Sequence, residues 1–546
     1  MNSFRQAVNF AMAQPQVRPL VEAPAPTLHL VERPRPAPVS KPAALMVITA
    51  LTALAIAIHG YHPYAEDGGI YLMGIKKLLH PSLYPYWSGF VTLQLRYSLF
   101  APMVAALVRA TRLSLMTVML VLYFVTTWLT LFAAWLIATR CYLNRQACYG
   151  AIALLGLWLT LPVAGTSLLL MDPYVTARSI STPFALFALA AALYVKRGID
   201  EGKRTQWGSI ALLVLSLVIA FFVHPLMTGY ALGCILLLAC LSLPAPRLRI
   251  TATTCLCLTA VLLAACVDGF SPLQTPQYAR VANTRTYWFL SSWHWYELLG
   301  AIAPPLVLAM LKSSIRQRKG RPAVLLADMA IVASITGLAI AALFARGSSH
   351  SLMVARLQPL RIFQIVYILM ILAIGAAVGE GVLKRHLFRW VAVFALLGGV
   401  MLFVQLTTFP NSAHIEFPWV APTNEWEQGF VWIRDHTAQD SVIAMDANYI
   451  TDAGEDAQNF RAIADRSAIP DYSKDGGLAA IAPDLTADWI AGEAFQQGLD
   501  RATDPQRIAI LRVSSARWVV LSQGASTQFD CPYSNNSMKV CRVPGV

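Results

Sequence analysis

Charged residues are scarce in this 546-residue chain, because Asp, Glu, Lys and Arg together make up only 13% of it. A typical soluble domain carries about twice that share of charge. Several motifs of soluble enzymes are also missing: the sequence has no Walker A loop, no HExxH, no GxSxG and no paired CxxC. These absences remove support for a soluble nucleotide hydrolase, a zinc protease or an α/β-hydrolase.

Apolar residues take the place of the missing charge and make up 57% of the chain. A transmembrane helix needs about 20 mostly apolar residues to cross a hydrocarbon layer about 30 Å thick. We therefore predict an α-helical polytopic membrane protein with about eleven transmembrane helices. Their expected ranges are 43–59, 113–138, 147–163, 183–195, 207–223, 226–243, 250–267, 294–311, 323–344, 362–381 and 390–408. The shorter apolar run Leu99–Val108 is expected to lie at the membrane interface.

Lys and Arg gather in the loops on one side of these helices. They include Arg140, Arg145, Arg247, Arg249, Lys384, Arg385 and Arg389. Because cytoplasmic loops retain basic residues, we expect the N-terminus in the cytoplasm and the C-terminal end outside it. This topology signal also explains the net charge of +13, so no nucleic-acid partner is expected. Treating Leu99–Val108 as a full span would place the later basic loops outside.

The chain divides into three expected parts. Residues 1–42 are rich in proline and poor in aromatic residues, which predicts a disordered cytoplasmic tail. Residues 43–408 form the transmembrane domain, which includes a long first external loop at 60–112. Residues 411–546 are expected to form a small external α/β domain, because helical patterns alternate there with short strand patterns.

The pattern of the external domain is specific enough to place individual elements. Helices are expected at 424–436, with Thr423 as the cap, and at 484–498 and 504–512; strands are expected at 441–445 and 517–521. Cys531 and Cys541 are the only cysteines of this domain. In an external compartment they are expected to form a disulfide, the alternative being two unrelated thiols.

Two adjacent carboxylates, Glu66 and Asp67, lie in the first external loop directly before an apolar helix expected at Ile70–Leu79. Such neighbours can divide the work at a site, one serving as a general base or metal ligand and the other positioning a substrate hydroxyl. The alternative is that they cap the helix and satisfy its free N–H groups. Both roles are compatible with the sequence.

Other polar residues that suggest chemistry fall in loops on the same external side. They are Asp172, Arg178, His224, Arg356, Gln358 and Arg361. Asp172 and Arg178 either pair with each other or leave the guanidinium to bind a phosphate. His224, at a helix end, is a base, a ligand or a structural residue. The last three residues suit a lipid-linked phosphate, or they anchor the chain among lipid headgroups.

The segment from Asp446 to Gly477 in the external domain is dense in Asp, Glu, Arg and Gly. Its acidity could hold a divalent cation or contact a sugar acceptor. The alternative is a solvated loop with internal salt bridges. A divalent cation is therefore the only cofactor that the sequence suggests, and it is not assigned to particular ligands.

The arrangement resembles the GT-C superfamily of membrane glycosyltransferases, which carry an acidic residue or pair in a long first external loop. The segments Tyr64–Tyr71, Asp172–Arg178 and Asp471–Gly477 more closely resemble a bacterial family of uncharacterised multi-pass membrane proteins. The superfamily resemblance implies transfer of a sugar from a polyprenyl-phosphate carrier to an extracytoplasmic acceptor. It also implies a bacterial inner membrane and a catalytic base at Asp67, with Glu66 as the alternative.

Two other functions stay open at this point. A protein of the same fold without catalytic activity would bind a partner or a lipid through its external domain. A lipid or solute transporter would carry polar residues near the middle of its spans and paired broken helices in two halves. The sequence shows neither feature of a transporter. The acid motif also lacks a second acidic pair in the next external loop, where Asp172 stands alone.

Overall fold

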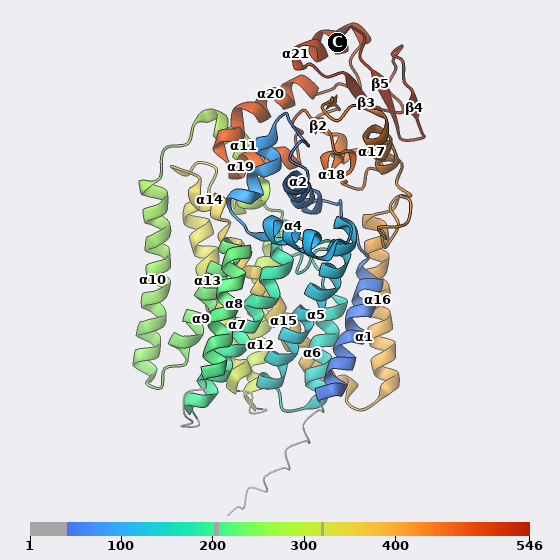
Figure 1. Ribbon diagram of the computed structural model, residues 1–546. Coiled ribbons are helices and arrows are strands. Elements are labelled where there is room, and N and C mark those ends of the chain that lie inside the picture. Colours follow the sequence, from blue (N-terminus) through green and yellow to red (C-terminus); the bar gives the residue numbers. More distant parts are fainter. Residues whose placement is uncertain (1–40, 201–206, 318–320, 546) are drawn as a thin grey trace, which may run out of the picture. The chain divides into compact units, whose positions relative to one another are not determined.

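The computed structural model describes residues 41–200, 207–317 and 321–545. Of the predicted tail, residues 1–40 lie outside this described part. Residues 38–546 form one compact unit, in which a bundle of long helices carries a small sheet-containing domain at one end (Figure 1). The predicted fold class, a multi-span helical protein with a small C-terminal α/β domain, is confirmed.

Each of the predicted spans overlaps a helix. The helices are α1 (Lys41–His59), α5 (Leu115–Cys141), α6 (Arg145–Leu157), α7 (Ala177–Asp200), α8 (Trp207–Val223), α9 (Pro225–Leu241), α10 (Pro246–Phe270), α12 (Trp295–Gln317), α13 (Arg321–Phe344), α15 (Phe363–Val378) and α16 (Leu387–Thr408). Within the described residues, 8 helices are long and apolar enough to cross a membrane, or up to 9 if a bent pair counts as one span. Helices α8 and α9 have 17 residues each, and α6 has 13.

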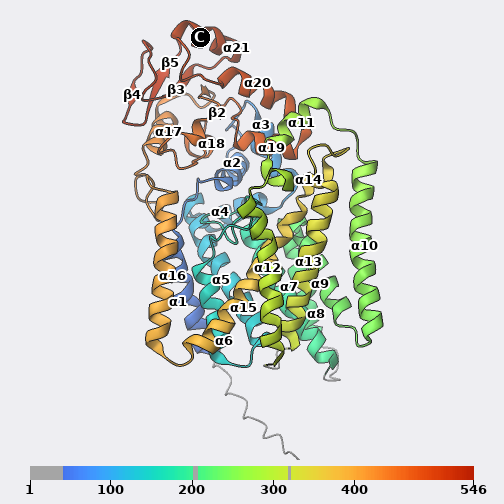
Figure 2. The same ribbon diagram turned by 180° about the vertical axis from the view of Figure 1, so that it is seen from behind.

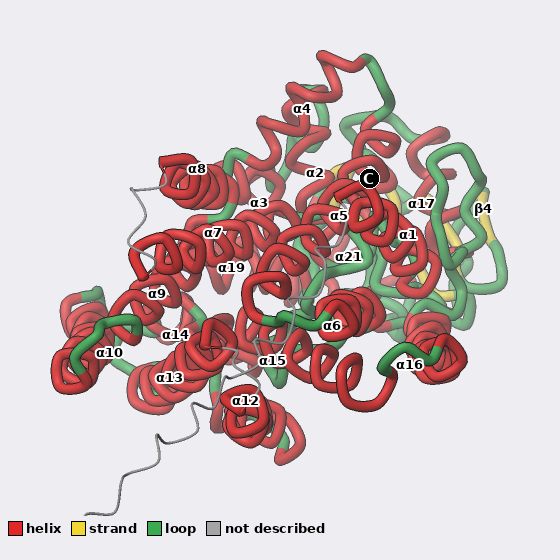
Figure 3. Tube along the Cα trace, turned by 90° about the horizontal axis from the view of Figure 1, so that it is seen from below, coloured by secondary structure: helices red, strands yellow, loops and turns green. Residues whose placement is uncertain are grey.

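Seen along the helices, α6 and α15 lie inside the bundle, whereas α10 and α16 lie at its periphery (Figure 3). Helix α10 has no buried residue, as expected of a helix that faces lipid. Helices α6 and α15 instead touch backbone to backbone: a Cβ atom on Gly150 would lie 2.3 Å from the carbonyl oxygen of Gly375. Small residues permit such close approach of helices in membranes.

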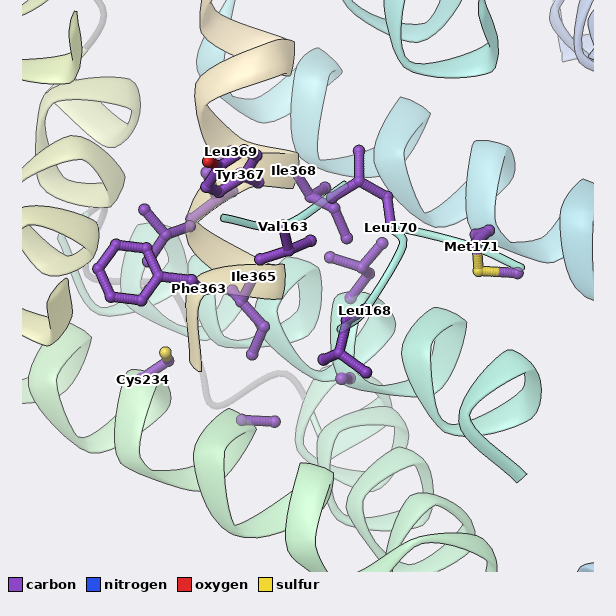
Figure 4. Close-up of a cluster of buried hydrophobic side chains, with 14 of the residues drawn as sticks. Val163, Leu168, Leu170, Met171, Cys234, Phe363, Ile365, Tyr367, Ile368 and Leu369 are labelled. Atoms are coloured by element: carbon purple, nitrogen blue, oxygen red, sulfur yellow. The ribbon is translucent and has the colours of Figure 1, made fainter. Parts of the chain in front are cut away.

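The segment 147–163 is not helical throughout, because α6 ends at Leu157 and an irregular stretch leads to α7. This stretch folds back on itself through a bridge between Pro162 and Leu169. Its apolar side chains, among them Val163, Leu168 and Leu170, belong to the same buried cluster as residues of α15 (Figure 4). The packing fixes the loop that leads to Asp172.

The first external loop contains α2 (Asp67–Leu79), α3 (Ser88–Thr92), η1 (Leu93–Arg96) and α4 (Phe100–Thr111). Helix α4 meets the preceding helical stretch at 94°. It coincides with the predicted interface run and exposes Met103 and Leu107. Helices α2 and α4 lie between the bundle and the external domain in both side views (Figures 1 and 2).

The remaining helices of the bundle's external side are short. They are α11 (Pro276–Asn283), η2 (Thr286–Trp288), η3 (Leu290–Ser292), α14 (Met353–Leu357) and η4 (Pro359–Ile362). At the opposite end, a short π-helix, η5 (Gly379–Leu383), follows α15. The connections α5–α6, α9–α10 and α15–α16 lie at that end, away from the external domain (Figures 1 and 2). The basic residues named above lie in these connections or in the adjoining turns of the helices that they join.

A five-stranded mixed sheet, with strand order β2-β1-β3-β5-β4, forms the centre of the external domain. Strand β1 is parallel to β2 and β3, whereas β5 is antiparallel to β3 and β4. The elements are α17 (Glu425–His436), β1 (Val442–Ala444), η6 (Tyr449–Thr451), α18 (Phe460–Ala464), β2 (Ser467–Ala468), α19 (Lys474–Ile481), η7 (Pro483–Leu485), α20 (Thr486–Gln496), α21 (Asp504–Ser514), β3 (Trp518–Ser522), β4 (Tyr533–Ser534) and β5 (Met538–Arg542).

The predicted cap of α17 is wrong, and the structure describes the two cysteines of the external domain. The cap of α17 is Asn424, whose side chain accepts hydrogen bonds from the backbone N–H groups of Trp426 and Glu427. Thr423 was expected there, but its hydroxyl donates to the carbonyl of Asn411 instead. Cys531 and Cys541 are joined by a disulfide bond.

Candidate functional site

A cavity of about 2080 Å³ lies between the membrane helices and the external domain. Its walls come from α2, the start of α7, the α8–α9 junction, α14, η4, the end of α16 and parts of the segments 448–457 and 472–481. All the site residues proposed from the sequence line it, namely Glu66, Asp67, Asp172, Arg178, His224, Arg356, Gln358 and Arg361. Pockets for small ligands usually measure about 300–1,000 Å³, so this one has room for more than one substrate.

The two adjacent acids differ in their surroundings. Glu66 occupies the N-cap position of α2, but its side chain makes no capping hydrogen bond; it pairs with Lys474 of the external domain. Asp67 is the first residue of the helix. Among the described residues, its carboxylate has no hydrogen-bond or ion-pair partner. Helix capping by the side chain therefore does not account for Glu66, and Asp67 is the acid with a free carboxylate.

The backbone at Glu66 is unusual, with φ 49° and ψ −123°. A residue with a side chain pays about 1–3 kcal/mol for such a conformation, which persists only where its surroundings enforce it. Here the Glu66 N–H donates to the carbonyl oxygen of Ala457 at 3.1 Å, and Ala65 forms an antiparallel bridge with Gln458. The external domain thus fixes the turn that presents Asp67.

Asp172 and Arg178 form a buried ion pair, with 2.5 Å between Oδ2 and Nη2. The alternative in which the two residues pair with each other is therefore realised. Burial raises the pKa of Asp172, while the adjacent guanidinium opposes that rise. The Arg178 Nε is buried without a partner, so the guanidinium is not fully used by this pair.

The three candidate residues before α15 differ in whether their polar groups already have hydrogen-bond partners. Arg356 is engaged, since its guanidinium donates to the carbonyl of Ile481 in α19 at 3.3 Å. Gln358 is buried in a left-handed conformation with φ 50°, and its Oε1 has no partner. Arg361 is half-buried, and within the described part of the chain its guanidinium forms no hydrogen bond or ion pair; its Nε is buried. Arg361 is therefore a cation available to a ligand.

These charged groups gather around one side chain. Burial raises the pKa of Tyr71, and the charges that act on its hydroxyl come from Asp67, Arg178, Arg361 and Asp172. The carboxylate of Asp67 and the guanidinium of Arg361 thus lie within electrostatic reach of the same hydroxyl, although they do not pair with each other. An unpaired acid and an unpaired guanidinium in one cavity can accept a proton and bind an anion in the same site.

His224 has a structural task. Its Nδ1 accepts the backbone N–H of Met227 at 3.4 Å and so caps α9. Burial, together with the nearby cations Arg361 and Arg178, lowers the pKa of His224 to about 3. The ring is neutral at physiological pH, so it contributes no positive charge to the binding of an anion.

Three cations of the cavity wall, Arg96, Arg285 and Lys474, were not among the site residues predicted from the sequence. Arg285 donates to the backbone carbonyls of Ser473 and Tyr472, at 2.7 and 3.2 Å, and so ties the segment before α19 to the bundle. Lys474 belongs to a segment that the family resemblance had marked, but no role had been assigned to it. Nothing in the spacing of the sequence around Arg285 distinguishes it from other loop arginines.

The acidic segment 446–477 contains a buried network. Arg461 pairs with Asp475 at 2.8 Å, and Asp475 accepts the backbone N–H of Asp471, also at 2.8 Å. These three side chains are almost fully buried, so this part of the segment is not a solvated loop. Among the residues that the structure describes, no group of three or more His, Cys, Asp or Glu side chains is arranged to hold a metal ion.

The fold and the cavity together define a multi-span helical membrane protein whose candidate site lies beneath its external domain. Similar solved structures include the oligosaccharyltransferase of Archaeoglobus fulgidus in its apo form, with 10% identity, a TM-score of 0.46, and coverage of 88% of this chain and 70% of that one. The archaeal oligosaccharyltransferase AglB from Archaeoglobus fulgidus, in complex with an inhibitory peptide and a dolichol-phosphate, has a TM-score of 0.45 at 10% identity and covers 88% and 69%. No family model matches the chain, and no curated protein matches it either.

Proposed function

We propose that this chain is a glycosyltransferase that moves a sugar from a polyprenyl-phosphate carrier to an acceptor on the external side of a bacterial inner membrane. The observation that carries the proposal is the pair of unpartnered charges, Asp67 and Arg361, in one large cavity. That cavity lies between the membrane-spanning helices and the external domain. A carrier with its chain in the lipid and its phosphate at the membrane surface could reach such a position.

The reaction uses the two charges in different ways. An acceptor oxygen attacks the anomeric carbon of the sugar, and the bond from that carbon to the phosphate oxygen breaks with both electrons going to the phosphate. Asp67 takes the proton of the acceptor hydroxyl as general base, a role that typically contributes about 10²–10⁴-fold to the rate. Arg361 binds the phosphate and stabilises the negative charge that develops on it.

Neighbouring groups support these roles without replacing them. The Asp172–Arg178 pair places a second guanidinium beside the cavity, and the buried Nε of Arg178 makes no hydrogen bond within the described residues. Arg356 and Arg285 are engaged with carbonyl groups of the external domain, so they keep the cavity wall in place. Because His224 is neutral, the positive charge near the proposed phosphate comes from the arginines.

The test is a comparison of lipids from three bacterial strains. The strains lack the gene, carry the parent gene or carry Asp67→Asn, and their lipid extracts are analysed by mass spectrometry. We expect the same polyprenyl-phosphate sugar to accumulate in the deletion strain and in the Asp67→Asn strain. An Asp67→Asn strain with the parent's lipid profile would contradict a base at this position. A deletion strain whose lipids do not change would contradict the donor class.

A further inference from the structure

The Glu66–Lys474 pair joins the first external loop to the external domain across 408 positions of sequence. The Lys474 side chain is 12% exposed and that of Glu66 is 46% exposed. Both residues line the cavity, next to the unpartnered Asp67. The external domain thus does more than cover the cavity, because it supplies a cation that is bonded to the neighbour of the proposed base.

Several contacts with the domain restrain the first turn of α2. The carbonyl of Tyr64 accepts the backbone N–H of Asn459 at 3.2 Å, in addition to the bonds of Glu66 and Ala65 described above. A Cβ atom on Gly69 would lie 2.2 Å from Cβ of Asn459, so the helix start is packed directly against this residue. Among the hydrogen bonds and ion pairs of the described residues, only that of Lys474 reaches a side chain of the acid pair.

Lys474 is itself held firmly. Its backbone N–H donates to the Asp471 carboxylate at 2.6 Å, and the next residue, Asp475, pairs with Arg461. On the side of the bundle, Arg285 binds the carbonyl of Ser473. A lysine with its backbone fixed from two sides can hold a carboxylate in one place.

We propose that Lys474 is a positioning residue, which holds Glu66 in its positive-φ conformation and thereby aims the Asp67 carboxylate into the cavity. Lys474 acts through Glu66 and does not touch the substrate. The proposal rests on the proposed function in taking Asp67 as the reacting group. The external domain is then a part of the site, and the bundle alone does not form it.

The first test needs no activity. Asp67→Cys is introduced into full-length protein in which Cys240, Cys255, Cys257 and Cys266, the free cysteines that are not buried, are replaced by Ser. We measure in detergent how fast the new thiol reacts with methyl methanethiosulfonate, which is uncharged. The pH is set high enough that the rate no longer rises with pH, so that the thiol is fully ionised. We expect Lys474→Met to change this rate about threefold or more, since directly coupled neighbours show effects of this size.

The matched control is Lys76→Met. Lys76 also joins α2 to the external domain, through Asp465 at 2.7 Å, but it lies at the other end of the helix. We expect this variant to leave the thiol rate within about twofold of the parent, as for a distant, independent site. Equal effects of the two lysine variants would overturn the proposal, and so would a parent-like rate in Lys474→Met.

The second test separates positioning from substrate contact. In the transfer assay, Lys474→Met should lower kcat and leave KM for the lipid donor unchanged, while Lys474→Arg and the exchanged pair Glu66→Lys with Lys474→Glu should recover most of kcat. A raised KM with unchanged kcat, or an exchanged pair no better than Lys474→Met alone, would overturn the proposal. Failure of the proposed function would give a different result. Sugar transfer would then survive in Asp67→Asn, while the reaction rate of the thiol at position 67 would still change in Lys474→Met.

Discussion

Two sets of charges in this molecule, one buried in the external domain and one half-buried in the cavity, differ in how their hydrogen-bonding capacity is used. In the external domain, Arg461, Asp471 and Asp475 bind one another and nearby backbone groups over 2.8–2.9 Å. In the cavity, Asp67 and Arg361 have no such partner among the described residues. Because an isolated charge away from water is costly, the first set holds the fold together and the second is available to a ligand.

Burial of a charged group therefore does not identify a site. The acidic segment 446–477 is the most charged stretch of the external domain, yet Arg461, Asp471 and Asp475 in its centre are bonded to one another, whereas both carboxylate oxygens of the buried Glu455 have no partner among the described residues. Asp67 and Arg361 differ from these groups because they are unpartnered and also line the cavity. Removing a charge from the Arg461 network should therefore destabilise the external domain. Removing Asp67 or Arg361 should change ligand binding or catalysis and leave stability unchanged.

The largest expected effect is on catalysis. Asp67→Asn should lower the rate of sugar transfer by about 10²–10⁴-fold, because it removes the proton acceptor. The unfolding midpoint in detergent should stay at the parent value, since no bond in the described part of the chain is lost. Glu66→Gln serves as the comparison and should retain more activity. A lowered midpoint in Asp67→Asn would place this residue with the structural charges.

A comparable effect, but on stability, is expected in the external domain. Arg461→Met leaves Asp475 buried without its ion pair, which should cost about 3–5 kcal/mol. The control is Arg434→Met, which breaks the largely exposed pair with Asp435 and should cost about 0–1 kcal/mol. Both are measured by chemical unfolding of the purified protein. Equal costs would mean that the Arg461 network does not hold the domain together.

Arg361→Gln should weaken binding of undecaprenyl phosphate by about 10–100-fold, since a hydrogen bond to a charged group contributes about 1.5–3 kcal/mol. Arg96 provides the control: it lines the cavity too, but it is bound to Asp484 at 2.7 Å and is largely exposed. Arg96→Gln should leave the Kd within about twofold, because surface pairs contribute little. Equal losses in the two variants would point to general attraction between the phosphate and the basic wall.

A smaller effect concerns a buried acid whose partners are neutral. Glu416 lies 2.8 Å from Nδ1 of His62, and burial raises the pKa of Glu416 to about 8 from 4.5, while burial lowers that of His62 to about 4. Between pH 4.5 and 8 the folded protein binds more protons at Glu416 than the unfolded chain does. Stability must then fall as the pH rises through this window.

The measurement is the unfolding midpoint between about pH 5 and about pH 8, compared for the parent and Glu416→Gln. The amide cannot ionise, so the variant should lose less of its midpoint across the window. Parallel curves for the two proteins would show that other groups cause the fall. Glu416 would then belong with the charges that are satisfied in the folded state.

The smallest expected effect checks a helix cap. Asn424→Ala should cost about 1 kcal/mol, because it removes an acceptor for two backbone N–H groups at the start of α17. Thr423→Ala should cost less, since Thr423 makes no capping bond to the helix. The reverse order in chemical unfolding would return the cap to Thr423.

The long elements could be predicted from the sequence because apolar runs of about 20 residues have one physical explanation. The helix over residues 147–163 was too long because periodicity cannot show that Val163 and Leu168 pack against α15 as a folded loop. Strands β2 and β4 have two residues each, which is too short for any alternation to be visible. Their pairing depends on partners elsewhere in the chain.

The site could be predicted in its location but not in its bonding. Placing Asp67, Asp172 and Arg361 on one side required only the topology of the helices and the distribution of basic residues. Which of these charges were already paired could not be read, since Asp172–Arg178 and Glu66–Lys474 depend on side-chain geometry. Lys474 was missed because its partner is 408 positions away and no local spacing links the two.

The distance between Glu66 and Lys474 along the chain also sets an order of events during synthesis. A ribosome adds about 5–20 residues each second, so about 20–80 s separate the synthesis of these two residues. The early helices can insert into the membrane in that time, while the turn before Asp67 still lacks the contacts that hold it. The reactive geometry is then completed near the end of translation, and a chain that stops before residue 457 would be inserted but inert.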